Sequence, residues 1–484
     1  MLKMFRVKKL REALLRAETY GEWLDAAGEL DRALGMDAWR KDDSSPYYNY
    51  RLVRRDMEQM REYRETANVY RLLDLLHDSL RRNLGDVGHP NLYDKALTGT
   101  KHLIEEYLAE AEKGLNYLCD NDFPHLLPDK KLRLFSQAAH NFGRSALMLS
   151  GGATFGIFHL GVVRTLWDHK LLPRVISGSS MGAIIAAGTC TRTDTEIQAI
   201  HDRTKPLNRN ALRWLPPSAM WREKSLMDQK QLLKNIQTNV GEYTFAEAYA
   251  RTGRILNISV SPTRMGIKPR VLNYITAPNV TIASAACASS AVPGVFPPAK
   301  LMAKDRAGQM VPYMANEKWV DGTLREDIPI MRLSRLHNVN HYIVSQANPH
   351  VIPFFGYRHR RGFTPFVVDL AASMVQGQVM QVLDVARQRV QQNPWRPILD
   401  QMYAVAGQQY SGDINIHLPF SAPMYRMVLA NPTEEQFEFF VRLGERASWS
   451  QVERIRNQTR ISRCFESCLE KLSPEGERVE ERPL

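Results

Sequence analysis

The spacing of apolar residues divides this chain into a helical first part and a mixed central part. Up to about residue 143, apolar positions recur every three to four residues, which predicts helices from about residue 50 into the sixties, over 70–80 and over roughly 98–119. From Arg144 to about Pro349, short apolar runs alternate with helical stretches. That alternation is typical of an α/β fold, with a mostly parallel sheet flanked by helices.

The short apolar runs mark the strands of this predicted sheet. They cover residues 144–149, 175–177, 254–260, 319–320 and 341–345, and a last strand is predicted at 413–418. A helix is predicted after Phe366 as far as Pro394, and helices fill 433–472. The chain therefore divides into a helical N-terminal domain at 1–143, an α/β domain at 144–350, a C-terminal extension at 351–472 and a charged tail at 473–484 that we expect to be disordered.

One strand of the sheet leads into a serine held between glycines. The strand ends near Gly178, Ser180 follows, and the small and aliphatic run from Met181 to Gly188 predicts a helix. Glycines at 178 and 182 permit a sharp strand-to-helix turn, which projects the serine hydroxyl at the N-terminus of a helix. The Gly-x-Ser-x-Gly segment therefore predicts a nucleophile elbow, with an ordinary glycine-serine loop as the alternative.

A serine nucleophile needs an oxyanion site and a base, and the sequence offers both. A predicted strand runs into Gly151, Gly152 and Ala153, whose N–H groups suit a tetrahedral oxyanion or, alternatively, an anion in a nucleotide-binding turn. Asp321 ends another apolar run. Because ligands bind at the carboxyl ends of parallel strands in such sheets, we expect Ser180 and Asp321 to lie at that edge.

A histidine is the alternative base, as in the triad of α/β-hydrolases, where the histidine follows the acid in the chain. Four histidines lie downstream of Asp321, at His341, His350, His359 and His417. None of them stands in a diagnostic motif.

Four motifs follow one another in a fixed order. They are Ser-Gly-Gly-x-x-x-Gly at 150–156, Gly-x-Ser-x-Gly at 178–182, Ala-Val-Pro at 291–293 with Phe-Pro-Pro at 296–298, and Asp-Gly at 321–322. This order resembles the patatin-like phospholipase family, and flanking residues such as Trp23, Trp39 and Gly444 resemble the patatin-domain triacylglycerol lipases of fungi and plants. The resemblance covers most of the chain, and it implies a patatin-like fold and a Ser–Asp dyad without histidine. In these terms Ser180 is the nucleophile, Asp321 the base, Gly151, Gly152 and Ala153 the oxyanion loop, and Gly156, Gly178, Gly182 and Gly322 are motif glycines.

The 484 residues carry a formal net charge of +12, and 44% of them are apolar. Nucleic acid, an anionic membrane surface and simple solubility are the competing explanations of that charge. Basic residues are interspersed with acidic ones and do not cluster with aromatic residues, which argues against nucleic acid. Peripheral contact with a membrane or a lipid-droplet surface suits an enzyme that acts on insoluble esters.

Composition also limits the compartment. The five cysteines form no disulfide framework, so we expect reduced thiols. The basic N-terminus lacks the uninterrupted apolar core of a secretory signal, and no apolar run is long enough to cross a membrane. We therefore expect a cytoplasmic protein that is not secreted, uses no cofactor or metal, and contacts lipid peripherally.

Three local features have two interpretations each. Leu10, Leu14 and Leu15 recur at helical spacing after a basic opening, on either an interfacial or a core-facing helix. The insertions 213–222 and 351–363 mix aromatic residues with arginine, and either rim an acyl pocket at a lipid interface or pack under the helical domain. His89 and Asp94 match a pattern of glycerolipid acyltransferases, but more often such a pair caps helices.

Together these observations predict a serine esterase that hydrolyses long-chain acyl glycerides, or a phospholipase, through an acyl-enzyme. The alternatives are an acyltransferase, in which a glyceride or lysophospholipid hydroxyl replaces water, and a non-enzymatic scaffold on a lipid surface. Phospholipid-cleaving patatins commonly carry a cation just before the last glycine of the loop, where this chain has Phe155. We therefore hypothesise a preference for tri- or diacylglycerol over phosphatidylcholine, unless Phe155 packs beneath the loop and Arg325 supplies the charge.

Overall fold

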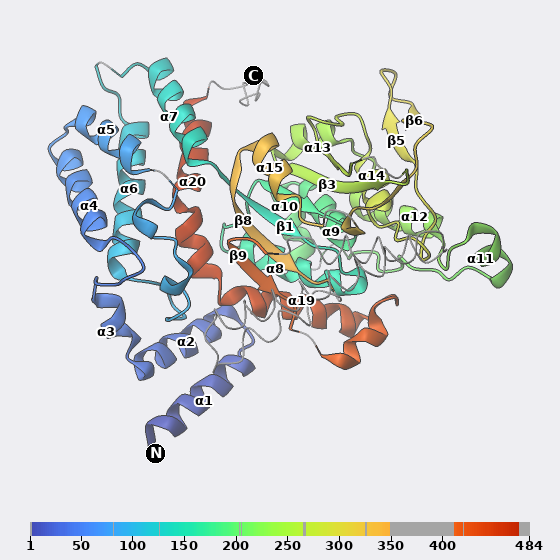
Figure 1. Cartoon of the computed structure of the whole chain (residues 1–484), viewed down its shortest axis with the longest axis horizontal. Helices are drawn as coiled ribbons and strands as arrows, with labels where there is room; N and C mark the ends of the chain where they lie inside the picture. Colours follow the sequence, from blue (N-terminus) through green and yellow to red (C-terminus); the bar gives the residue numbers. More distant parts are fainter. Residues whose placement is uncertain are drawn as a thin grey trace, which may run out of the picture. The chain divides into compact units, whose positions relative to one another are not determined.

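The computed structural model describes residues 2–80, 82–124, 126–202, 204, 206–264, 268–324, 327–348, 411–419 and 421–473. The chain forms two compact units. One consists of Met1–Ser145, Asn338–Asn340 and Trp449–Leu484, and the other of Ala146–His337 and His341–Ser448. Most of the elements of both units are labelled in Figure 1.

The first unit is built from helices. They are α1 (Leu2–Arg16), α2 (Tyr20–Leu34), α3 (Met36–Lys41), α4 (Tyr50–Glu65), α5 (Val69–Ser79), α6 (His102–Asp120), α7 (Pro128–Phe142) and α20 (Val452–Leu472), with 3-10 turns at Leu84–Asp86 and Pro90–Leu92. The three helices predicted between residues 50 and 119 correspond to α4, α5 and α6.

The core of this unit forms around the apolar face of α6. Leu103, Ile104 and Tyr107 are buried on that face, at the spacing that the sequence predicted. They belong to one cluster with apolar residues of α4, α5 and α20. Phe465 of α20, for example, lies with its ring centroid 6.3 Å from that of Phe135. Helix α20 therefore completes the core to which α4, α5 and α6 contribute.

Two features that the sequence left open lie in this unit. On α1, Leu14 packs against the small core of Trp23 and Trp449, whereas Leu15 is exposed. His89 caps a 3-10 turn, because its Nδ1 accepts a hydrogen bond from the N–H of Asn91 at 3.2 Å. Capping is thus the observed role of His89, and not that of an acyltransferase motif.

The second unit is built on a seven-stranded sheet with the order β4-β3-β2-β1-β8-β9, in which β7 also pairs with β3. Its strands are β1 (Arg144–Leu149), β2 (Val175–Gly178), β3 (Ile255–Pro262), β4 (Arg270–Leu272), β7 (Trp319–Asp321), β8 (Val339–Gln346) and β9 (Ile414–His417). β1, β2 and β3 pair in parallel, as do β8 and β9, whereas β4 and β7 are antiparallel to β3. The predicted α/β fold class, a mostly parallel sheet, is confirmed.

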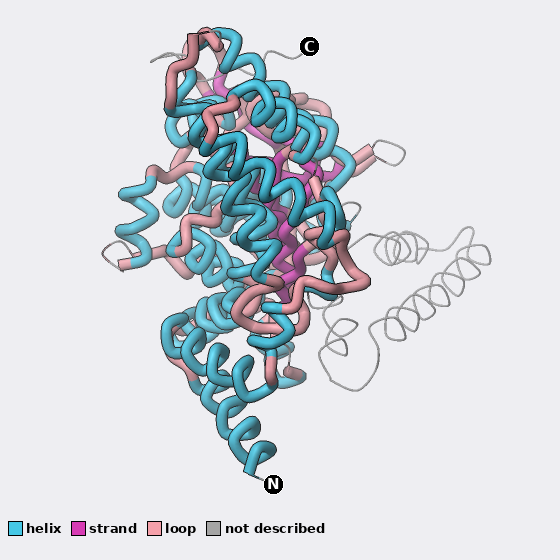
Figure 2. The backbone as a smooth tube through the Cα atoms, turned by 90° about the vertical axis from the view of Figure 1, so that its left-hand side faces the viewer, coloured by secondary structure: helices cyan, strands magenta, loops and turns pink. Residues whose placement is uncertain are grey.

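Helices accompany the sheet on its faces, as the strands drawn between helices in Figure 2 show. β2 and β3 are buried along their whole length, as strands covered on both faces must be. No helix that the structure describes is both long and apolar enough to cross a membrane. The helices of this unit are α8 (Phe158–Asp168), α9 (Met181–Cys190), α10 (Asp194–His201), α11 (Pro217–Glu223), α12 (Gln229–Val240), α13 (Phe245–Thr252), α14 (Ile282–Ser289), α15 (Ile330–His337) and α19 (Glu434–Trp449), with 3-10 turns at Ala153–Ile157, Gly322–Leu324 and Ala422–Met427.

Three short strands were not predicted. They are β4 and the two strands of a separate hairpin, β5 (Leu301–Lys304) and β6 (Met310–Tyr313). Each is only three or four residues long, too short for an alternating pattern to stand out. Several predictions fall outside the described residues, namely the insertion 351–363, the helix after Phe366, His350, His359, Arg325 and the tail beyond Ser473.

The pairing of β3 places two of the predicted site residues together. β2 pairs with β3 as far as Gly178 opposite Ile258, and β7 occupies the same edge of β3 further along, with Asp321 opposite Val260. Because β2 leaves the sheet there, β7 brings Asp321 beside the turn that holds Ser180. The sequence reasoning put Asp321 at the carboxyl end of a parallel strand, and the structure corrects this, because β7 runs antiparallel to β3.

Candidate active site

Ser180 stands at a sharp turn between β2 and α9. Its backbone has φ 52° and ψ −124°, a conformation that residues other than glycine rarely adopt. The neighbouring glycines permit the turn, because a Cβ at Gly178 would overlap the carbonyl group of Gly182, and one at Gly182 would overlap that of Leu149. The local geometry is that of a nucleophile elbow.

Hydrogen bonds fix the serine turn from both sides. The N–H of Ser180 donates to Oγ of Ser289 at 3.0 Å, and that hydroxyl donates to the carbonyl oxygen of Ser259 at 2.7 Å. The carbonyl oxygen of Ser180 accepts from the N–H groups of Ala183 and Ile184, which begins α9. The side chain of Ser180 is therefore held at the N-terminus of a helix, where the helix dipole favours negative charge.

Asp321 is fully buried at the end of β7. Its Oδ1 accepts hydrogen bonds from the N–H and the hydroxyl of Thr323, both at 2.8 Å, whereas its Oδ2 has no partner of regular geometry among the described residues. Burial raises the pKa of Asp321 to about 6, against the lowering effect of Thr323 and of the Ser180 hydroxyl. One carboxyl oxygen of Asp321 is thus anchored by Thr323, and the other is not anchored by any described residue.

The loop after β1 carries the three predicted oxyanion donors. The N–H of Gly151 donates to Oδ1 of Asp327 at 2.9 Å, so this amide is engaged, in contrast to the prediction. The N–H groups of Gly152 and Ala153 donate to no acceptor within the described ranges. The loop lies against the elbow, because a Cβ on Gly151 would be 3.5 Å from the Cβ of Ser180. Two amides therefore remain available beside the serine.

Asp327 is a second buried carboxyl group at this site, and the sequence analysis missed it. Its Oδ1 accepts from Gly151, its Oδ2 from Nδ2 of Asn348 at 3.3 Å, and its carbonyl oxygen from the Ser179 hydroxyl at 2.9 Å. Burial raises its pKa to about 7; the bonds from Gly151 and Asn348 lower the pKa, and the charge of Asp321 raises it. The available signal was a second acidic residue on the segment that follows Asp321.

His159 braces the loop through both of its ring nitrogens. Its Nδ1 lies 2.7 Å from Oγ of Ser345, and its Nε2 lies 3.0 Å from the carbonyl oxygen of Ser150. Burial lowers the pKa of His159 to about 4, so the ring is neutral at pH 7.

Two of the histidines proposed as alternative bases, His341 and His417, lie within the described residues. His341 lies on β8 and His417 on β9. Among the described residues, no histidine is hydrogen-bonded to Ser180 or Asp321.

Phe155 packs into the interior. Its side chain is fully buried, and its ring centroid lies 5.6 Å from that of Phe440 and 6.4 Å from that of Tyr425. The packing role that the sequence left open for Phe155 is therefore observed, whereas Arg325 lies outside the described residues. The preference for neutral lipids over phosphatidylcholine stays a prediction.

The structure describes no disulfide and no cluster of metal-ligating side chains in the ranges given above. All five cysteines are buried and form no disulfide. The described side chains include no group of three or more His, Cys, Asp or Glu residues placed to hold a metal ion.

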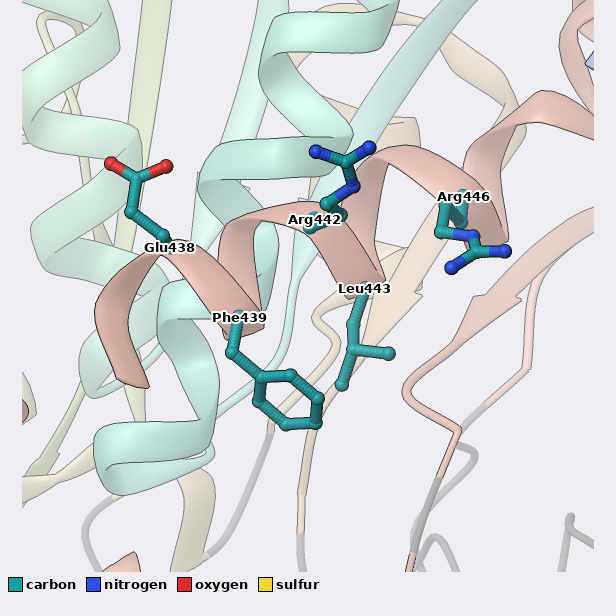
Figure 3. A pocket seen from close by; sticks show the side chains of 5 residues that line it. All are labelled: Glu438, Phe439, Arg442, Leu443 and Arg446. Carbon is teal, nitrogen blue, oxygen red and sulfur yellow. The ribbon is translucent and has the colours of Figure 1, made fainter. Parts of the chain in front are cut away.

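A cavity of about 320 Å³ lies on α19. Figure 3 shows the five side chains that line it, all of which project from this one helix: Glu438, Phe439, Arg442, Leu443 and Arg446. Neither Ser180 nor Asp321 lines this cavity, so it is separate from the candidate dyad.

Known proteins resemble this chain along most of its length. Residues 147–334 match the family described as patatin-like phospholipase, and residues 3–140 match a domain of unknown function, DUF3336. Triacylglycerol lipase 4 of Saccharomyces cerevisiae is 37% identical over 466 residues, which cover 91% of this chain and 50% of the yeast protein. Triacylglycerol lipase SDP1L of Arabidopsis thaliana is 33% identical, covering 96% of this chain and 59% of its own length.

A patatin-like phospholipase domain-containing protein of Aspergillus terreus is 33% identical over 506 residues, which cover 97% of this chain and 69% of that protein. This chain thus spans between half and about two thirds of the length of these relatives.

Proposed function

This chain belongs to the patatin-like phospholipase family, and on that premise we propose that it is a serine lipid esterase that hydrolyses acyl glycerides, triacylglycerol among them. One observation carries the proposal, namely that the Ser180 hydroxyl in its elbow lies close enough to the buried carboxyl group of Asp321 to lower its pKa, while Oδ2 of that carboxyl group has no partner of regular geometry among the described residues. A nucleophile next to its base is the arrangement that acyl transfer needs. The names of the relatives supply the substrate class.

In the first step, Asp321 takes the hydroxyl proton of Ser180 while Oγ bonds to the ester carbonyl carbon. The charge that develops on the carbonyl oxygen is stabilised by the N–H groups of Gly152 and Ala153 and by the N-terminus of α9. We assign Gly151 to holding the loop, because its amide donates to Asp327. The tetrahedral intermediate then breaks the ester C–O bond, the proton passes from Asp321 to the departing alcohol, and the acyl group stays on Ser180.

In the second step, water replaces the alcohol. Asp321 takes a proton from the water molecule whose oxygen attacks the acyl carbonyl carbon, and the same amides hold the oxyanion. The bond to Oγ breaks, the proton returns to Ser180, and the fatty acid leaves. One carboxyl group serves both steps, and its pKa of about 6 favours this, because a base is most effective when its pKa lies near the working pH.

Long-chain acyl glycerides are insoluble, so the enzyme meets them at a lipid–water interface. We therefore include peripheral contact with a membrane or lipid-droplet surface in the proposal. The formal net charge of +12 supports contact with anionic headgroups.

The test is hydrolysis by the Ser180→Ala and Asp321→Asn variants of the full chain. Each is expected to lower hydrolysis of a triolein emulsion and of a soluble p-nitrophenyl ester by about 10³-fold or more, with circular dichroism unchanged. An Asp321→Asn variant that keeps its activity, alongside an inactive His341 or His417 variant, would refute the dyad. Acyl transfer that outpaces fatty-acid release when lysophospholipid is added would identify an acyltransferase instead.

A further inference from the structure

Residues 213–228 form a hairpin whose tip is α11, which extends at the right-hand edge of Figure 1. In its stalk, the N–H of Leu215 donates to the carbonyl oxygen of Leu226 at 3.0 Å, and the N–H of Asp228 donates to that of Arg213 at 2.9 Å. Trp214 pairs with Met227 in an isolated bridge between these bonds. The hairpin is therefore a hydrogen-bonded β-type stalk that carries α11 at its end.

The hairpin exposes large apolar side chains to water at its tip and along its stalk. Trp221 at the tip is 88% exposed, and on the stalk Trp214 is 56% exposed and Leu226 is 39% exposed. The other tryptophans described in this unit, Trp167 and Trp319, are half-buried and buried. Two exposed tryptophans on one hairpin indicate a surface that a binding partner covers in the functional state.

Cations flank the exposed rings. The Arg222 side chain is 77% exposed next to Trp221 and lies 3.5 Å from Glu223, and Lys224 follows directly with a left-handed backbone, at φ 50°. At the base, Arg213 is held by the carboxylate of Asp228. An aromatic ring with an exposed cation beside it is the combination that suits the headgroup region of a lipid layer.

The stalk of the hairpin is hydrogen-bonded to residues 291–295. The same segment is hydrogen-bonded to the backbone of Asp321, the proposed general base. The N–H groups of Leu226 and Met227 donate to the carbonyl oxygen of Val295 at 3.1 and 2.9 Å. On the same segment, the carbonyl oxygen of Ala291 accepts from the N–H of Asp321 at 3.1 Å. A lipid surface that holds the tip is therefore connected to the dyad through a few backbone hydrogen bonds.

We propose that the tip of this hairpin inserts into the headgroup region of a phospholipid surface that carries anionic lipids. Trp221 at the tip lies between headgroups and acyl chains, Trp214 and Leu226 on the stalk face the lipid surface, and Arg222 and Lys224 meet the lipid phosphates. This inference rests on the proposed function, because it names the surface by which the esterase reaches an insoluble ester.

The experiment measures binding of the full chain to phosphatidylcholine vesicles with and without phosphatidylserine, by flotation. The wild type is expected to bind, more tightly with phosphatidylserine and less tightly at high salt. Trp221→Ala is expected to weaken binding about tenfold, because it removes the most exposed apolar side chain. Arg222→Glu combined with Lys224→Glu is expected to abolish the preference for phosphatidylserine.

Matched controls lie on α15 of the same unit. Met331→Ala removes a side chain that is 62% exposed, and Arg335→Glu reverses an exposed charge. Both should bind like the wild type. Met4→Ser with Phe5→Ser tests α1, which also carries exposed apolar residues beside basic ones.

Three results would overturn the proposal: no vesicle binding by the wild type, wild-type binding by the hairpin variants, or loss of binding in the α1 variant alone. A change of oligomeric state in Trp221→Ala without a change in vesicle binding would assign the hairpin to a second copy of the chain, and would also overturn it. Hydrolysis of a soluble ester separates the two proposals, because the hairpin variants should keep it. If the wild type hydrolyses no ester, the proposed function fails while the binding result still stands.

Discussion

Replacing Asp327 by asparagine is expected to stabilise the protein increasingly as pH rises above about 4, and to leave it nearly unchanged below that pH. The carboxyl group is buried, and its pKa is raised from the usual 3.8 to about 7. Between these values the folded chain holds a proton that the unfolded chain releases. The wild type therefore loses stability as pH rises through this window, whereas asparagine cannot titrate.

The size of the effect follows from the two pKa values. At about 1.4 kcal/mol for each pH unit, the gain in unfolding free energy grows from about 2 kcal/mol at pH 5 to about 4 kcal/mol at pH 8. Asparagine keeps an oxygen that can accept from the N–H of Gly151, and the amide of Asn348 can turn to offer its own oxygen to the new NH₂ group. The comparison therefore isolates the charge from the hydrogen bonds.

Urea unfolding of both proteins at several pH values between 5 and 8 measures this difference. Asp327→Ala is the matched variant, because it removes the charge and also the acceptors for Gly151 and Asn348, and it should lower kcat/KM where asparagine does not. A stability difference that stays constant from pH 5 to pH 8, or a less stable asparagine variant at pH 8, would refute the reasoning. The acid limb of kcat/KM should stay near pH 6 in Asp327→Asn, because wild-type Asp327 is still neutral when Asp321 ionises.

Two further predictions concern the loop and the elbow. Phe155→Ala should lower the unfolding free energy by about 3–5 kcal/mol, because it empties a fully buried aromatic site, and a wild-type melting temperature would contradict this. Gly182→Ala should abolish ester hydrolysis and lower the melting temperature, because its Cβ would overlap the carbonyl group of Leu149, whereas Gly28→Ala on α2, with open space around it, should melt at or above the wild-type temperature.

The sheet could be predicted from the sequence because its central strands are buried on both faces. β1 coincides with the predicted run 144–149, and β2 and β3 differ from prediction only at their ends. Continuous apolar runs are typical of such strands, and they need no knowledge of their neighbours. The direction of β7 could not be predicted in this way. It depends on the part of the β3 edge that β2 leaves free, and no local pattern encodes that edge.

The candidate site shows the same limit. Gly178, Ser180 and Gly182 predict their own conformation, because a strand, a turn and a helix are local structures. Asp327 and Phe155 depend on packing. The sequence cannot tell that the Asp327 carboxyl turns toward Gly151, or that Phe155 turns away from the loop to meet Phe440.

The most direct test of the proposed mechanism is covalent trapping of the serine. The full chain is incubated with a fluorophosphonate, or with a p-nitrophenyl ester and acid quench, then digested and analysed by mass spectrometry. The mechanism predicts an adduct on the peptide that contains Ser180, no adduct in Ser180→Ala, and much slower labelling in Asp321→Asn. An active, folded protein that carries the adduct on another residue, or no adduct at all, would contradict it.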